Sequence, residues 1–150
     1  MSTATVVTNE SGVRFAARVR SHSVFTDQGA KGGGFDSAPS PVDLLGVALG
    51  SCVAFYVRQF LLTRLISVDG MRVEVTQRNG VEPARIAEFN VLIVLPSDLP
   101  ARHRLILDRV VKTCPVYNTL ACGATISVEV TAPSASSLDD FAEMADCIGR

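Results

Sequence analysis

The chain has 150 residues and a formal net charge of −1, with 47% hydrophobic and 19% charged residues. This length favours one domain with a sizeable core, and the apolar content excludes a disordered chain. A near-neutral charge supplies no concentrated basic face, so we expect neither nucleic acid nor a membrane surface as a partner. The longest uncharged run, residues 44–57, is shorter than the roughly 20 residues of a membrane span. Because the chain shows no secretory signal pattern, we expect a cytoplasmic protein with reduced thiols.

The first half of the chain predicts two strands and one long helix. Residues rich in β-formers predict strands over 13–19 and 23–26, and the glycine triplet 32–34 in the following loop is interpreted as a flexible connector. Ser40 predicts a helix start, because Pro41 follows at the first helical position and Asp43 completes a capping box. We expect this helix to reach about residue 65.

The long helix is apolar on every face from residue 44 to residue 57, which predicts burial all round. Gly46 and Gly50, four residues apart, predict a tight contact with another helix. One subunit of this size does not easily surround such a helix. We therefore expect an intimate homodimer in which a second subunit supplies the missing cover.

The second half alternates strands and helices. An alternating pattern predicts a strand over 71–77, with a turn at Asn79-Gly80. The stretch from Phe89 to Leu95 predicts a second long strand over 86–95. Asp98 is expected to cap a helix, a short helix is expected over 115–120, and a final strand over 124–130. This order predicts an α+β fold with a mostly antiparallel sheet. Residues 1–132 are interpreted as one domain and residues 133–150 as a linker with a short acidic amphipathic tail.

Two of the four cysteines are candidates for thiol chemistry. Cys52 lies inside the apolar helix, where burial raises a thiol pKa, so a reactive Cys52 needs a nearby cation or hydrogen bond. Taken alone, Cys52 also fits a core cysteine. Cys114 lies at the expected start of the helix at Pro115, where free backbone N–H groups favour a thiolate, and both a reactive and a structural role stay open. Cys122 and Cys147 are interpreted as bystanders.

Metal and cofactor patterns are missing from the sequence. There is no C-x-x-C pair, and His22 and His103 are far apart. We therefore expect no metal site and no bound cofactor.

Three segments resemble the OsmC/Ohr family of peroxide-reducing proteins. They are Ser-Pro-Val-Asp-Leu-Leu from Ser40, Ala-Leu-Gly-Ser-Cys ending at Cys52, and Thr-Cys-Pro-Val-Tyr-Asn-Thr-Leu from Thr113. The resemblance spans about residues 13–130 and implies an OsmC-like domain over 1–132. It implies antiparallel sheets wrapped around central buried helices in an intertwined homodimer, with two sites at the dimer interface. Cys52 would then be the peroxidatic thiol, Cys114 the resolving thiol, and a dithiol such as a lipoyl group the reductant.

The charged groups of the site depart from the family pattern. The best-known members carry a glutamate ten residues before the first cysteine, where this chain has Val42. Asp43, nine residues before Cys52, matches the acid of another, OsmC-like branch of the family. Two roles stay open for Asp43: the acid of the site, or a helix cap alone. The family also uses an arginine to hold the thiolate. Arg20 is favoured for this role among four candidates, which are Arg14, Arg18, Arg20 and Lys31.

The sequence therefore predicts a thiol-dependent peroxidase that reduces organic hydroperoxides in oxidative stress defence. An apolar lining favours organic substrates over hydrogen peroxide, and its expected members are Leu44, Leu49, Phe55 and Phe60. One alternative is a small-molecule binding or carrier protein of the same fold with little peroxidase activity. The other is a thiol sensor or a purely structural dimer.

Overall fold

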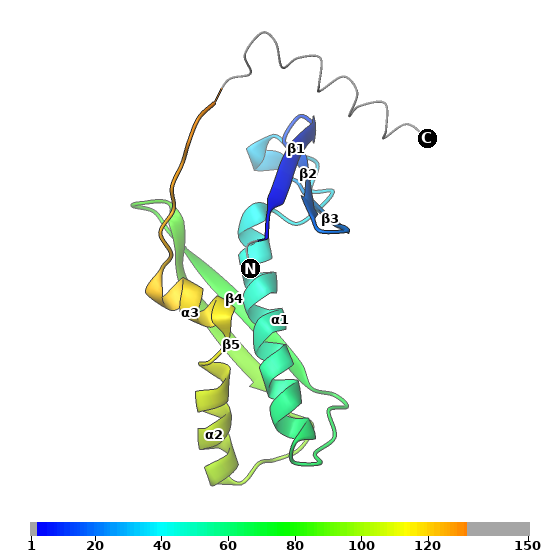
Figure 1. Cartoon of the computed structure of the whole chain (residues 1–150), viewed down its shortest axis with the longest axis vertical. Coiled ribbons are helices and arrows are strands. Elements are labelled where there is room, and N and C mark those ends of the chain that lie inside the picture. The colour runs from blue at the N-terminus through cyan, green and yellow to red at the C-terminus, as the bar shows by residue number, and fades with distance from the viewer. Residues whose placement is uncertain (1–2, 132–150) are drawn as a thin grey trace.

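The computed structural model describes residues 3–131 and has the predicted α+β architecture. A three-stranded antiparallel sheet opens the chain, with β1 over Thr5–Ser11, β2 over Arg14–Val19 and β3 over His22–Thr26. This sheet lies near the N-terminal half of the long helix (Figure 1). The sequence analysis missed β1, whose seven residues are all exposed and show no buried face.

The long helix α1 covers Pro41–Leu62, three residues shorter at its end than expected. Its predicted capping box is confirmed: the Asp43 N–H donates to Ser40 Oγ over 3.2 Å, and the Ser40 N–H donates to Asp43 Oδ2 over 3.0 Å. These bonds satisfy backbone donors that a helix start leaves free. A short 3₁₀ turn, Ala30–Gly32, lies in the preceding loop.

A second antiparallel pair packs against α1. Strand β4 covers Arg72–Gly80 and β5 covers Arg85–Val94, so β4 runs through the expected turn at Asn79-Gly80. Val73 pairs with Ile93, and Val75 pairs with Val91, which puts these apolar side chains on one face. That face turns towards α1, while the other face carries the surface ion pairs Arg72–Glu74 and Arg78–Glu88.

The two glycines of α1 contact β4, so the predicted helix–helix contact is wrong for this chain. A Cβ atom at Gly50 would lie 3.0 Å from Cγ2 of Val75, and one at Gly46 would lie 3.4 Å from Oε1 of Gln77. The glycines thus let the strand approach the helix closely.

Two helices follow the hairpin, α2 over Ala101–Val111 and α3 over Pro115–Cys122. The expectation that Asp98 caps α2 is wrong. Pro100 is the N-cap residue, with no side-chain cap, and Asp98 instead forms an ion pair with Arg104. The chain enters α2 two residues after Asp98, which is too late for an N-cap.

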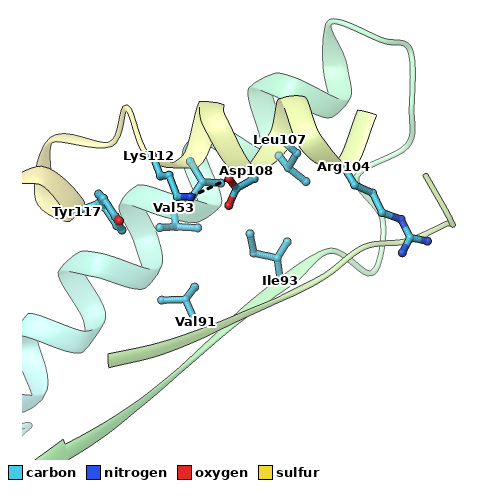
Figure 2. A pocket seen from close by; sticks show the side chains of 9 residues that line it. Val53, Val91, Ile93, Arg104, Leu107, Asp108, Lys112 and Tyr117 are labelled. Carbon is cyan, nitrogen blue, oxygen red and sulfur yellow. Dashed lines mark hydrogen bonds and ion pairs between the residues drawn. The ribbon is translucent and has the colours of Figure 1, made fainter. Parts of the chain in front are cut away.

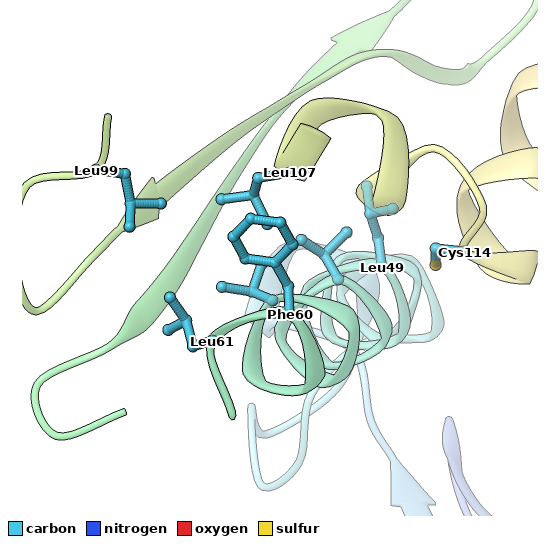
Figure 3. Packing of buried hydrophobic residues seen from close by; sticks show 8 residues of the cluster. Leu49, Phe60, Leu61, Leu99, Leu107 and Cys114 are labelled. Carbon is cyan, nitrogen blue, oxygen red and sulfur yellow. The ribbon is translucent and has the colours of Figure 1, made fainter. Parts of the chain in front are cut away.

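The core lies where α1 meets α2, α3 and the β4–β5 hairpin. Figure 3 shows Phe60 and Leu61 of α1 packed towards Leu107 of α2 and Leu99 before it. The buried apolar residues of this cluster are Leu49, Val53, Val57, Phe60, Leu61, Leu99, Leu107 and Cys114.

Within one chain α1 is buried on one side only, so the expectation of burial all round is not met by a single copy. Val47 is 58% exposed and Phe55 is 56% exposed. Among the described residues α1 alone is long and apolar enough to cross a membrane, by length and composition. This is weak evidence, since the core helix of a globular protein passes the same test.

Residues 124–130 are extended, but the described chain gives them no strand partner, so the predicted final strand does not form within it. Their apolar side chains alternate and are exposed, at 84% for Ile126, 83% for Val128 and 91% for Val130. A strand needs a neighbour for its backbone groups, and local alternation does not provide one. The predicted amphipathic tail lies outside the described residues.

Candidate thiol site

The structure brings Cys52 and Cys114 together, although they are far apart in the sequence. Cys52 lies midway along α1 and is partly buried, and Cys114 is completely buried just before α3. Neither cysteine is in a disulfide. The Cys114 thiol lies within hydrogen-bonding reach of Cys52 and raises the pKa of the Cys52 thiol. The packing of α3 on α1 creates this contact.

Cys114 is the N-cap of α3, as predicted. Its Sγ accepts a hydrogen bond from the backbone N–H of Tyr117 over 3.4 Å, and Pro115 occupies the first helical position. The proline fixes the backbone there and disfavours helical geometry at Cys114, which leaves the sulfur facing the free N–H groups.

The pKa of the Cys52 thiol is raised above its usual value. Burial is the main cause, because it disfavours the charged thiolate, and the neighbouring Cys114 thiol acts in the same direction. The backbone N–H of Val116 lowers the pKa and partly offsets them. No side-chain cation acts on Cys52 within the described chain. A reactive Cys52 therefore needs a further positive group.

Asp43 does not reach Cys52 in the same chain. Nine residues separate them, which is about two and a half turns, so they lie on opposite faces of α1 and about 14 Å apart along it. The Asp43 carboxylate is instead bound to Ser40, and Gln77 of β4 donates to it over 3.5 Å. The hydrogen bonds from Ser40 hold the pKa of Asp43 below its usual value.

Arg20 lies at the exposed tip of the β2–β3 hairpin with a positive φ of 54°, and the described chain does not bring it to Cys52. Arg14 is the candidate cation with the most contacts. Its guanidinium donates to Ser37 Oγ over 2.6 Å and to Glu10 over 2.9 Å, and it stacks 4.9 Å from the centre of the Phe25 ring.

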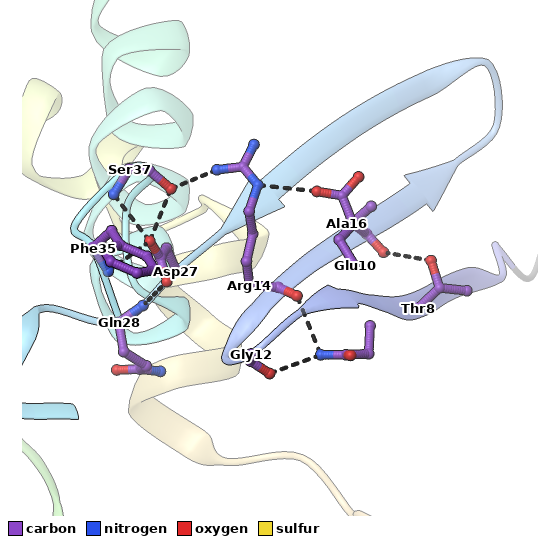
Figure 4. A network of polar contacts seen from close by, with 10 residues as sticks. Thr8, Glu10, Gly12, Arg14, Ala16, Asp27, Gln28, Phe35 and Ser37 are labelled. Carbon is purple, nitrogen blue, oxygen red and sulfur yellow. Dashed lines mark hydrogen bonds and ion pairs between the residues drawn. The ribbon is translucent and has the colours of Figure 1, made fainter. Parts of the chain in front are cut away.

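Asp27 organises the loop before α1, and the sequence analysis missed it. Figure 4 shows its buried carboxylate between the backbone N–H groups of Gln28, Phe35 and Ser37, and Ser37 Oγ donates to it over 2.8 Å. The hydrogen bonds from Ser37 are the main cause that lowers the pKa of Asp27 to about 2. Gly34 is required here, since a Cβ atom would overlap the Gln28 carbonyl. The glycine triplet thus belongs to an ordered loop, and the available signal was an acid, Asp27, five residues before it.

The expected apolar lining of the thiol site stays a prediction. Leu49 lines a hollow of about 200 Å³ that neither Cys52 nor Cys114 lines, Phe60 is buried in the core, and Phe55 is exposed. Among residues 3–131 no three His, Cys, Asp or Glu side chains gather closely enough to hold a metal ion.

The family model described as OsmC-like protein matches residues 34–129, which include both cysteines. The chain belongs to the OsmC-like protein family. A search of curated proteins found no match.

Solved structures of OsmC-like proteins share the fold. A Psychrobacter arcticus 273-4 protein, described as an osmotic stress induced and detoxification response protein, is 26% identical with a TM-score of 0.71, covering 79% of this chain and 88% of that chain. An OsmC like protein from Mycoplasma pneumoniae is 19% identical with a TM-score of 0.65, covering 87% and 96%. An organic hydroperoxide resistance protein from Elizabethkingia anophelis is 12% identical with a TM-score of 0.65, covering 82% and 90%. At these identities the latter two likenesses concern the fold alone.

Proposed function

We propose that this OsmC-like protein is a thiol-dependent peroxidase that reduces organic hydroperoxides with Cys52 and Cys114. The observation that carries the proposal is the contact between Cys52 on α1 and Cys114 at the N-cap of α3. Two free thiols beside one another can form a disulfide, whereas lone core cysteines cannot. Solved relatives described as organic hydroperoxide resistance proteins support the substrate class.

The chemistry needs two thiols, a peroxide and an external dithiol. The Cys52 thiolate attacks the distal peroxide oxygen, so that an S–O bond forms, the O–O bond breaks and the alkoxide leaves as an alcohol after protonation. The Cys114 sulfur then attacks the sulfenic acid, and water leaves as the disulfide forms. A dithiol, of the lipoyl type in this proposal, restores both thiols by exchange and becomes oxidised itself.

A second copy of the chain completes the site in this proposal. Cys52 needs a cation to offset its burial, and Arg20 of a second copy is the proposed source. We assign Asp43 to the same shared site as its acid, in addition to its capping role. Neither residue acts on Cys52 of its own chain, so we assign both to the part of the site that the second copy supplies.

The exposed apolar surface supports a homodimer. One face of α1 is left uncovered, with Val47 and Phe55 more than half exposed, and the strand-like segment 124–130 has an exposed apolar stripe. Burial of such surfaces against a second copy is favourable by about 25 cal/mol per Å². Gel filtration with light scattering tests this point, and a folded monomer at micromolar concentration would contradict it. A cytoplasmic location is part of the proposal.

Peptide mapping by mass spectrometry tests the thiol pair directly. Reduced protein receives one equivalent of tert-butyl hydroperoxide and is digested without reductant. We expect a Cys52–Cys114 linked peptide, and the Cys122→Ser variant should form it equally well. A link between other cysteines, or none, would contradict the proposal.

A binding or carrier protein remains the second candidate, and Val42 at the position of the family glutamate favours it. Peroxide consumption with and without dihydrolipoamide separates the two. Turnover over many equivalents supports the peroxidase, whereas its absence in folded, reduced protein supports the carrier.

A further inference from the structure

The start of α3 lies on the turn of α1 that carries Cys52. Tyr117, in the first turn of α3, lines a pocket of about 300 Å³ together with Val53, and it lines the hollow of about 200 Å³ together with Leu49. Leu49 and Val53 stand three residues before and one residue after Cys52. Figure 2 shows Tyr117 and Val53 beside the first of these spaces. The first turn of α3 is therefore packed against the Cys52 region of α1.

The backbone donors at the start of α3 can be accounted for one by one. The Cys114 N–H donates to the last carbonyl of α2 over 3.1 Å, and the Asn118 N–H donates to the Cys114 carbonyl over 3.0 Å. Pro115 has no N–H. Of the donors that a helix start leaves free, two therefore remain, and they belong to Val116 and Tyr117.

Each of these two donors acts on one sulfur. The Tyr117 N–H donates to Cys114 Sγ over 3.4 Å. The Val116 N–H makes no backbone hydrogen bond within residues 3–131, and the sulfur that it faces is that of Cys52, where it favours the thiolate. A single helix start thus serves both thiols, with one N–H group for each.

We propose that the backbone N–H of Val116 is a catalytic group of the thiol site, which holds the Cys52 sulfur from within the same chain. The inference deepens the proposed function and rests on it in one respect, the role of Cys52 as the attacking thiol. Arg20 of a second copy would act on the same sulfur from outside the chain, so the two groups act together. Pro115 is then a positioning residue, because it keeps Cys114 out of the helix and leaves Val116 as the first N–H of α3.

The start of α2 offers a matched control. Ala101 is the first residue of α2, and its N–H, like that of Val116, has no acceptor inside its own helix. This end of α2 lies beside Phe60, since the ring of His103 is 6.4 Å from the Phe60 ring. Phe60 is eight residues, or about 12 Å, further along α1 than Cys52. Loss of the Ala101 N–H therefore affects a helix start in the same way without touching the thiol site.

Replacement of one peptide bond by an ester tests the proposal, because it deletes a single N–H group and keeps the side chain. In the full-length, reduced protein, Val116 is replaced by its α-hydroxy acid analogue, and in the control Ala101 is replaced by lactate. Alkylation with iodoacetamide over a range of pH values, resolved by peptide mass spectrometry, reports the thiolate of Cys52.

We expect Cys52 of the Val116 ester to be alkylated about three- to tenfold more slowly at neutral pH, with its rate profile shifted to higher pH. The thiolate fraction falls by more than this, but a more basic thiolate is a better nucleophile, which offsets part of the loss. Exposed Cys122 is the internal reference, and its rate should be the same in both esters and the unmodified protein. Equal Cys52 rates in the two esters, whether unchanged or slowed alike, would overturn the proposal.

Amide NMR of the unmodified protein keeps the test decisive if the Val116 ester fails to fold. The Val116 amide proton should shift with pH at the same midpoint as the alkylation of Cys52, and the Cys52→Ser variant should lose this shift. A Val116 amide proton that does not follow the Cys52 titration would overturn the proposal. Neither measurement uses peroxide, so its outcome is independent of whether the protein reduces hydroperoxides.

Discussion

The contact between α1 and β4 at Gly50 gives a quantitative test of the fold. A Cβ atom there would lie 3.0 Å from Cγ2 of Val75, closer than an ordinary van der Waals contact. A Cβ atom at Gly46, one turn earlier, would meet the end of the flexible Gln77 side chain at 3.4 Å and Cγ1 of Val75 at 4.0 Å, which is an ordinary contact. Both positions are glycines of α1 and both are partly buried, so substitutions at the two positions can be compared directly.

Two opposing terms set the size of each effect. Replacing glycine by alanine inside a helix gains about 1 kcal/mol, and overpacking a filled core costs about 1–3 kcal/mol. Gly46→Ala should therefore raise the free energy of unfolding by about 0.5–1 kcal/mol. Gly50→Ala should be near neutral or destabilising, and Gly50→Leu should lower the free energy of unfolding by about 2 kcal/mol.

Urea unfolding followed by circular dichroism, at one fixed protein concentration, measures these differences. The reasoning is refuted if Gly50→Leu is as stable as the unmodified chain. It is equally refuted if Gly46→Ala and Gly50→Leu destabilise by the same amount, because the strand contact would then not decide the outcome.

Three further predictions concern the thiols and the two acids. Cys52→Ser should abolish peroxide reduction, whereas Cys114→Ser should complete one turnover and retain a sulfenic acid that dimedone labels; full activity of Cys52→Ser would disprove the peroxidase proposal. Asp43→Asn should cost at most about 1 kcal/mol in urea unfolding but lower peroxide turnover at least tenfold, and unchanged turnover would leave Asp43 a helix cap only. Because the pKa of Asp27 is lowered to about 2, its stabilising contribution is complete above about pH 4 and is lost as the pH falls towards 2. Asp27→Asn should flatten the dependence of the unfolding midpoint on pH in this range, and an unchanged dependence would contradict the assignment.

Features that depend on neighbouring residues could be predicted from the sequence. The capping box of Ser40 and Asp43, and the N-cap position of Cys114, each involve groups three residues apart. Side-chain alternation likewise predicted β4, because one face packs on α1 and the other meets solvent. The family resemblance, not the spacing, supplied the pairing of Cys52 with Cys114.

Features that depend on distant residues could not be predicted in the same way. Nothing local distinguishes a glycine pair that meets a helix from one that meets Val75 of a strand. The residues that bond to Asp27 lie up to ten positions later, within a loop without periodicity. Segment 124–130 has the alternation of a strand, but a strand also needs a partner, and in the described chain this segment pairs with none.

The position of Cys114 at the start of α3 has an electrochemical consequence. The N–H of Tyr117 that reaches its sulfur stabilises a thiol or thiolate more than a disulfide sulfur, which is a poorer acceptor. A helix cap is worth about 0.5–2 kcal/mol, and 1.4 kcal/mol corresponds to about 30 mV for a two-electron couple. If Cys52 and Cys114 form a disulfide, α3 therefore raises its midpoint potential by about 10–40 mV, which makes the oxidised protein easier for a dithiol to reduce.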